Sequence, residues 1–262
     1  MAISDIGIAG FLCRLLGFLK HHRKVLVPSN QAIPATNHLL ESIPRKDRQR
    51  FLAGCEQVEL VFGDILFEPG QTIHHVYFPI DSFISLLTPI EGHGNLEVAL
   101  VGNEGMYGAP LMLGINVTSF HGVVQGTGTA WRMDTERFHN ELEHSVALQQ
   151  ELNHYIHVLM LQLAQTAACN RYHVIEERIA RWLLMTRDRA HSNEFYITHE
   201  YLAHMLGVRR VGITKAAGSL QQKKIISYTR GKVKIHNIAG LEAASCSCYK
   251  TDIETYARIM HC

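Results

Sequence analysis

The segment Tyr201–Gln221, "YLAHMLGVRRVGITKAAGSLQ", contains two apolar repeats of helical period, separated by a glycine. Thr198 precedes the first repeat and is placed to cap its helix. Gly207 can adopt a positive φ, which would end that helix and turn the chain. The inward faces are expected to be formed by Leu202, Ala203 and Leu206, and then by Ile213, Ala216, Ala217 and Leu220. This spacing predicts a helix-turn-helix.

The outer side of the second helix is predicted to be cationic and to bind double-stranded DNA. It is expected to present Arg209, Arg210, Gly212, Thr214 and Lys215. The arginine fork matches guanine O6 and N7, and it also matches phosphate. The first turn of a helix attracts phosphate through its free amides and its dipole. Because Gly212 and Thr214 have little bulk, we expect the helix to approach base edges in the major groove.

A basic hairpin is expected after the second helix. The sequence "KKIISYTRGKVKIHNIAGL" predicts strands at 225–229 and 232–236 around an Arg230-Gly231 turn. Five cations accompany it, namely Lys223, Lys224, Arg230, Lys232 and Lys234. Such a wing is suited to contact backbone phosphates, with Arg230 and Lys232 as the candidate residues.

The distribution of charge supports a polyanionic partner for this region. The 262-residue chain has a net charge of +1, but residues 1–169 carry −6 and residues 170–262 carry +7. Residues 198–234 hold eight cations and one carboxylate, which accounts for the whole excess. Hydrophobic content of 47% and charged content of 19% are typical of a globular protein, and no apolar run is long enough for a membrane span.

The first half of the chain predicts a different architecture. All seven prolines lie at or before Pro110, and short alternating apolar runs between turn residues predict many short strands. We therefore expect an α+β protein with an N-terminal β-roll at 36–133, after an extension at 1–35 without the pattern of a signal peptide. A short helix is expected to open at Ser42, with Pro44 in its first turn.

Residues 134–169 are expected to form one long helix between this roll and the DNA-binding domain at 170–262. Its heptad seam is mostly apolar and includes Leu148, Leu152, Tyr155 and Leu159. A seam of this kind predicts pairing with a second copy of the chain. The alternative is that the helix packs on its own β-roll.

The order of β-roll, long helix and winged helix-turn-helix resembles the Crp/Fnr superfamily of bacterial transcription regulators. The resemblance covers about residues 36–250 and is strongest in "AACNRYH", "ERIARWLL", "THEYLAHMLGVRR" and "SCSCY". It implies a homodimer that binds a palindromic operator. It also implies base contacts for Arg210 and Lys215, and a phosphate contact for Arg209. RNA polymerase is an expected further partner, and the lack of an export signal predicts a cytoplasmic location.

The candidate effector pocket departs from the nucleotide-binding members of that superfamily. Those members carry a glutamate that binds the ribose and an arginine that neutralises the cyclic phosphate. Here Gly108 and Ala109 occupy the first segment, and Phe120 and His121 occupy the second. Because a phosphate buried without a cation has a large desolvation cost, we expect no ordinary response to cyclic AMP. The effector stays unidentified.

The sequence gives only weak signals for a metal, redox or catalytic site. Cys246 and Cys248, with Cys169 and Cys262, form at most a minor candidate for a metal or redox site, and no cofactor is expected. Oxygen-sensing members of the superfamily use a cysteine group near the N-terminus, where this chain has only Cys13. No catalytic constellation is assignable, so an enzyme is not expected. Two alternatives stay open: a thiol- or metal-based redox regulator, and a ligand-binding adaptor that uses the winged helix for protein contact.

Overall fold

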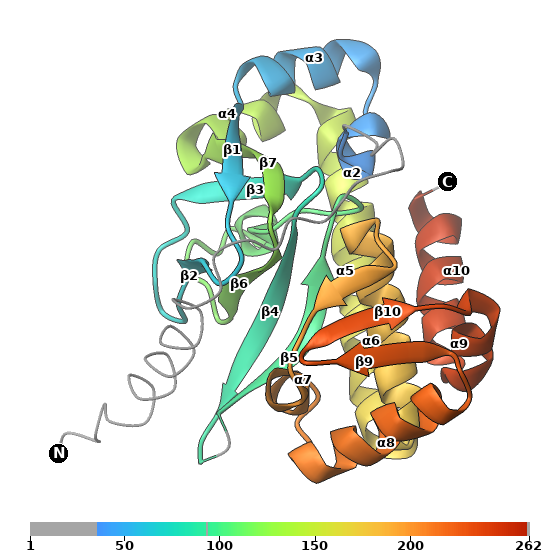
Figure 1. The fold of residues 1–262 in the computed structure, drawn as a ribbon. Helices are drawn as coiled ribbons and strands as arrows, with labels where there is room; N and C mark the ends of the chain where they lie inside the picture. Colours follow the sequence, from blue (N-terminus) through green and yellow to red (C-terminus); the bar gives the residue numbers. More distant parts are fainter. Residues whose placement is uncertain (1–35, 93, 261–262) are drawn as a thin grey trace, which may run out of the picture.

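The computed structural model describes residues 36–92 and 94–260, and the extension expected at 1–35 lies outside them. A strand-rich first half and a mainly helical second half are joined by one long helix, α5 (Val146–Tyr172), as Figure 1 shows. The expected α+β architecture is confirmed. Among the described residues, no helix combines the length and apolar character that a bilayer crossing requires.

The first half is a roll of two antiparallel sheets. One sheet has the order β1-β7-β3, with β1 at Glu56–Leu60, β7 at Gly128–Asp134 and β3 at His75–Pro79. The other has the order β2-β6-β4-β5, with β2 at Ile65–Phe67, β6 at His121–Gly126, β4 at Phe83–Ile90 and β5 at Gly94–Val101. A short 3-10 helix, η1 (Ala109–Leu113), connects β5 to β6. Buried residues from both sheets form one core.

The N-terminal helices differ from the prediction. From residue 36 onward there are two of them, α2 (His38–Glu41) and α3 (Arg45–Ala53), and α3 begins after Pro44. Ser42 ends α2, where its hydroxyl donates to the Leu39 carbonyl at 2.8 Å. Because a residue before proline disfavours helical geometry, the chain is interrupted at Ile43 and Ser42 does not open α3.

The single long helix expected at 134–169 is also wrong. The chain forms α4 (Thr135–His144) and then α5, with Ser145 extended between them at φ −138° and ψ 101°. The Ser145 hydroxyl accepts a hydrogen bond from the Leu148 amide at 3.1 Å and donates to Asp47 at 3.0 Å. A new helix start capped by this buried serine therefore replaces the continuous helix.

The apolar seam proposed for dimerisation faces the core of its own chain. Leu148, Leu152 and Tyr155 are buried with the β-roll residues, and Leu159 is partly buried against the same core. The Tyr155 hydroxyl donates to the Met106 carbonyl at 3.2 Å. Leu148, Leu152 and Tyr155 are therefore not available to a second copy, because burial in the roll already uses this face of α5, whereas Leu159 is covered only in part.

The second half is built on α6 (Ile175–Ala190), which follows α5 after a short break. It continues through β8 (Glu194–Tyr196), α7 (His199–Met205), α8 (Arg210–Gln222), β9 (Ile226–Thr229) and β10 (Lys232–Ile235). The chain then forms α9 (Ile238–Ala244) and α10 (Cys248–Met260), and α10 returns to pack along α5 (Figure 1). The three strands pair in the order β8-β10-β9.

Candidate nucleic-acid interface

The helix-turn-helix consists of α7, a turn at Gly207 and α8. The Thr198 hydroxyl accepts from the Tyr201 amide at 3.1 Å, as expected for the N-cap of α7. Gly207 has φ 61°, and the Val208 amide donates to the Ala203 carbonyl at 3.0 Å. A Cβ on Gly207 would lie 2.8 Å from the end of the Leu96 side chain on β5, which can shift, so it is the positive φ that requires glycine here.

The turn is supported from beneath by α6. The buried Arg178 guanidinium donates to the Leu206 carbonyl at the end of α7. A Cβ on Gly212 would lie 2.7 Å from Ile175, which places Gly212 against α6 and not on the outer side of α8. The expectation that Gly212 lies on the DNA side is therefore wrong. Its small size serves the close approach of two helices instead.

The outer side of α8 is cationic and exposed. Arg209, Arg210, Thr214 and Lys215 are all exposed, as the sequence predicts. Two further positions belong to this surface. Val211 is 60% exposed, and a Cβ on Gly218 would meet nothing within 4 Å. Val211 lies four residues before Lys215 and Gly218 lies three after it, so the helical period could have identified both positions from the sequence. Val211 also offers an apolar contact suited to a thymine methyl group.

Thr214 is held by its neighbours on this surface. Its hydroxyl donates to the Arg210 carbonyl at 3.1 Å and lies 3.1 Å from Nδ1 of His199 on α7. The His199 ring packs on Tyr228 of the wing, with the ring centroids 4.4 Å apart. Burial and the positive charge of Arg210 lower the pKa of His199. The two helices and the wing therefore present one fixed surface.

The wing has the predicted form, with a two-residue turn between β9 and β10. Arg230 and Gly231 have φ of 49° and 84°, the left-handed pair that matches the twist of a tight hairpin. Both lysines of β10 contact Glu194, with N–O distances of 2.7 Å for Lys232 and 2.6 Å for Lys234. These contacts lower the pKa of Glu194 to about 2. A phosphate at the wing would compete with Glu194 for Lys232, while Arg230 projects from the tip.

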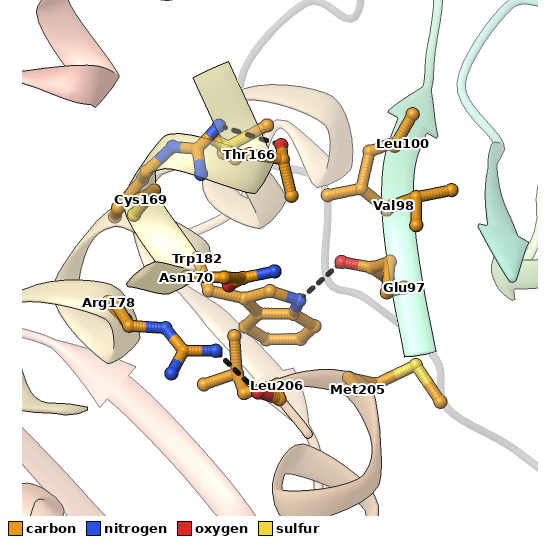
Figure 2. Close-up of a pocket in the computed structure, with 13 residues that line it drawn as sticks. Glu97, Val98, Leu100, Thr166, Cys169, Asn170, Arg178, Trp182, Met205 and Leu206 are labelled. Atoms are coloured by element: carbon orange, nitrogen blue, oxygen red, sulfur yellow. Dashed lines mark hydrogen bonds between the residues drawn. The ribbon is translucent and has the colours of Figure 1, made fainter. Parts of the chain in front are cut away.

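The helix-turn-helix packs against the β-roll. Figure 2 shows Trp182 of α6 directed at Glu97 of β5, to which its Nε1 donates at 2.7 Å. Met205 of α7 is buried with Leu87 and Val123 of the roll. A cavity of about 30 Å³ remains at this contact. The position of the outer side of α8 is thus fixed relative to the β-roll by both apolar packing and a buried carboxyl group.

Glu97 has an unusual environment for an acidic residue. It is 8% exposed, and burial raises its pKa to about 7 despite hydrogen bonds from Ser85 and Trp182. The Ser85 hydroxyl lies 2.7 Å from Oε2 of Glu97 and 2.7 Å from Oε1 of Gln125. Because one hydroxyl has one proton to donate, a proton on Glu97 completes this network.

Glu97→Gln is expected to stabilise the protein at pH 8 and to have little effect at pH 5. The folded state holds a proton that the unfolded chain, with a pKa near 4.5, releases. Wild-type stability therefore falls as pH rises from about 4.5 to about 7, whereas glutamine stays neutral. The difference at pH 8 should be on the order of 3 kcal/mol. Urea unfolding at both pH values measures it, with exposed Glu59→Gln as the control. An equal effect of Glu97→Gln at the two pH values would contradict the assignment.

The two candidate effector segments are neighbours on the roll through the residues that flank them, Tyr107 and Gly122, and Phe120 is partly buried against the core. Gly108 precedes η1 with φ 110°, and a Cβ on Gly122, next to His121, would touch the Tyr107 ring. Ala109 and His121 are buried, and Nδ1 of His121 has no hydrogen-bond partner in the structure. Burial is the main cause that lowers the pKa of His121. An uncharged histidine supplies no cation for a phosphate.

Comparisons with known proteins agree with this architecture. Residues 177–244 match the family model of the Crp-like helix-turn-helix domain. The chain is 22% identical over 180 residues to the global nitrogen regulator of Nostoc sp., covering 65% of this chain and 81% of that protein.

Two solved structures share the fold. The c-di-GMP responsive global regulator CLP of Xanthomonas campestris is 14% identical, with a TM-score of 0.61, and the match covers 74% of this chain and 99% of that one. A Crp/Fnr-family transcriptional regulator of Thermus thermophilus is 18% identical, with a TM-score of 0.58, and covers 72% and 98%. Residues 177–244 are therefore a Crp-like helix-turn-helix domain, and the chain as a whole shares its fold with regulators of the Crp/Fnr family.

Proposed function

We propose that this protein is a homodimeric transcription regulator that reads a palindromic DNA operator with the outer side of α8. The observation that carries the proposal is the exposed arrangement of Arg209, Arg210, Thr214 and Lys215 beside a basic wing. Helix-turn-helix proteins place the first turn of the second helix in the major groove, and Arg210 is the first residue of α8. Arg210 and Lys215 are assigned to base edges, while Arg209, Arg230 and Lys232 are assigned to phosphates.

The proposed dimer uses the face of α5 that points away from the roll. Its residues follow one another at alternating steps of four and three, and all are exposed: Val146, Gln150, Asn153, His157, Met160, Ala164 and Ala167. Met160 is 61% exposed and Val146 is 69% exposed. This heptad face can form a two-stranded seam, with the small Ala164 and Ala167 allowing close approach and Asn153 favouring one register. Pairing of two chains along this face would relate their two copies of α8 by a two-fold axis.

The signal is proposed to differ from an ordinary cyclic nucleotide. Ala109 offers no carboxylate for a ribose, and the buried His121 is expected to be uncharged at neutral pH. Titration calorimetry with cyclic AMP should show no binding in the micromolar range. The domain boundaries at 36–133 and 170–262, and a contact with RNA polymerase, stay predictions.

Arg210→Ala tests the proposal. Loss of a bidentate contact with guanine should weaken operator binding by about 1–3 kcal/mol and relax specificity at one base pair of each half-site. Arg209→Ala should instead weaken all sequences to a similar extent and reduce the dependence on salt. Gel-shift titrations at two salt concentrations measure both effects, with Arg48→Ala on α3 as the control. Unchanged affinity and specificity in Arg210→Ala would disprove the base-reading assignment.

This basic surface also weighs against the adaptor alternative. An adaptor would use this surface for an acidic protein partner, and its binding to DNA would then show no preference among sequences. The same titrations, carried out with operator and with scrambled duplex, separate the two functions because only a DNA reader distinguishes these duplexes.

A further inference from the structure

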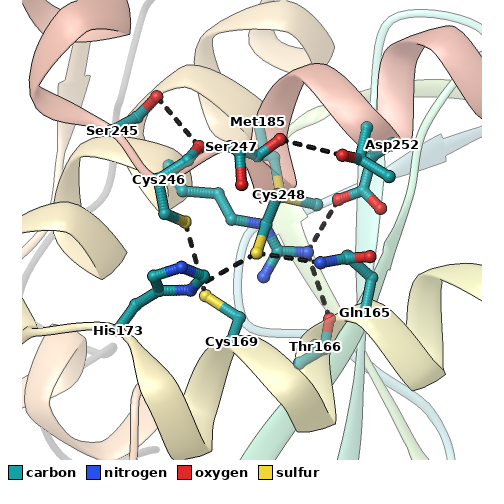
Figure 3. A network of polar contacts seen from close by, with 12 residues as sticks. Gln165, Thr166, Cys169, His173, Met185, Ser245, Cys246, Ser247, Cys248 and Asp252 are labelled. Carbon is teal, nitrogen blue, oxygen red and sulfur yellow. Dashed lines mark hydrogen bonds and ion pairs between the residues drawn. The ribbon is translucent and has the colours of Figure 1, made fainter.

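Four side chains that carry soft metal-binding atoms converge where α5 ends and α6 begins. Cys169 and His173 are one helical turn apart at the end of α5, and Cys246 and Cys248 come from the segment that leads into α10 (Figure 3). Their three sulfur atoms and one ring nitrogen all lie within 4.8 Å of one another. The sequence pointed to Cys246 and Cys248, with Cys169 and Cys262, but His173 was missed. Its spacing of four from Cys169 on a helix was the available signal. Cys262 lies outside the described residues.

The distances in this cluster fit one tetrahedral ion. Cys169 Sγ lies 3.6 Å from Cys246 Sγ, and Cys248 Sγ lies 3.4 Å from His173 Nδ1. Zinc–sulfur bonds of about 2.3 Å and zinc–nitrogen bonds of about 2.0 Å give tetrahedral edges of roughly 3.8 Å between sulfurs and roughly 3.5 Å between sulfur and nitrogen. These two pairs are therefore already spaced as two ligands of one ion would be, and all four ligand atoms lie within 4.8 Å of one another.

The surroundings of the cluster are those of a buried site. Cys169 and Cys248 are each 1% exposed, Cys246 is 5% exposed, and the three thiols form a cluster of their own, separate from the apolar cores. Gln165 Nε2 donates to Cys248 Sγ at 2.9 Å. Arg181, which is bonded to Asp252 at 2.7 Å, places a positive charge beside Cys169. A group that orients a ligand and a charge that stabilises thiolates are both features of metal sites.

We propose that Cys169, His173, Cys246 and Cys248 form a structural site for one zinc ion. Three thiolates and one imidazole are a common ligand set for structural zinc, and four protein ligands leave no open position for catalysis. An iron–sulfur cluster distributes its ligands over several irons and requires them to be farther apart than in this compact group. A disulfide between Cys169 and Cys246 is the competing use of the same thiols.

The ion would join three parts of the chain at one point. It would connect the end of α5, the turn into α6 at His173–Val174 and the segment before α10. This is the junction between the helix proposed for dimerisation and the DNA-binding half. Metal removal should therefore loosen the relative position of the two halves.

The metal content of the full-length protein tests the site without reference to DNA. Failure of the zinc-site proposal can therefore be distinguished from failure of the proposed function. Protein purified under reducing conditions, without a metal-affinity column, should contain about one zinc per chain by plasma mass spectrometry. Cobalt exchanged for zinc should give thiolate charge-transfer absorption and the visible bands of a tetrahedral ion. Reduced protein that holds no zinc and gives no such cobalt spectrum would overturn the proposal. Iron with acid-labile sulfide, or a Cys169–Cys246 disulfide in place of metal, would also overturn it.

Variants assign the ligands. Cys248→Ser should weaken cobalt binding at least tenfold, whereas Cys55→Ser, a half-buried thiol on the β-roll side, should leave it unchanged. His173→Cys retains four ligands, so it should keep the metal and shift the cobalt spectrum toward that of a four-thiolate site. This variant keeps the test valid if Cys248→Ser does not fold. Equal losses in Cys55→Ser and Cys248→Ser, or an unchanged spectrum in His173→Cys, would show that these residues do not bind the ion.

Discussion

Leu152→Ala is expected to lower the free energy of unfolding by about 2–5 kcal/mol without weakening self-association. Leu152 is 0% exposed and packs in the core that α5 shares with the β-roll. Removal of its branched end would leave a cavity that the close-packed surroundings fill only in part. Urea unfolding at a fixed protein concentration measures the loss, and sedimentation equilibrium measures the association.

Val61→Ala is the matched control for this prediction. Val61 is 49% exposed and lies outside both faces of α5, so its truncation should change stability by no more than about 0.5 kcal/mol and leave association intact. If Leu152→Ala instead separated the dimer and left the stability of each chain unchanged, the apolar face of α5 would be the dimer seam after all. The assignment of that face to the core would then be wrong.

Met160→Glu is expected to raise the dimer dissociation constant at least a hundredfold. Met160 is 61% exposed at the centre of the outward heptad face of α5. In a two-fold pair the new carboxylates would face each other in a desolvated seam, where like charges cost several kcal/mol. Operator affinity should fall with the dimer, because each half-site would then be bound by a separate chain. Sedimentation velocity and gel-shift titration measure the two effects.

Val61→Glu provides the control for the introduced charge. Val61 is 49% exposed on the β-roll, away from α5, so the same apolar-to-acidic change there should leave association intact. A Met160→Glu protein that stays dimeric and binds operator normally would place the interface elsewhere. The combined results of Leu152→Ala and Met160→Glu therefore decide which face of α5 a second copy contacts.

The helix-turn-helix could be predicted because its signals are local. A capping threonine, a glycine that needs φ 61° and two apolar repeats all act within about twenty residues. The exposed cations of α8 followed from the same helical period. The role of Gly212 could not be predicted in this way, because its contact with Ile175 joins parts of the chain that are distant in sequence.

The error on α5 has a physical reason. The helix carries two faces with heptad spacing, and the sequence signal is stronger on the more apolar one. That face is apolar because it is buried in the roll of its own chain, as Leu148 and Leu152 show. The outward face is more polar, with Asn153 and His157 beside Met160, so its heptad is less conspicuous. The start of α5 was missed as well, because Ser145 ends α4 without a proline or glycine.

Selection of bound DNA from a random pool tests the central claim most directly. That claim is that two copies of α8, one from each chain of a dimer, recognise the base sequence of duplex DNA. The wild-type protein should enrich a palindrome whose half-sites are about 10 base pairs apart, centre to centre. The Arg210→Ala protein should lose preference at the symmetric positions that Arg210 contacts. Recovery of sequences without any common motif, or of a motif that Arg210→Ala leaves unchanged, would contradict the account.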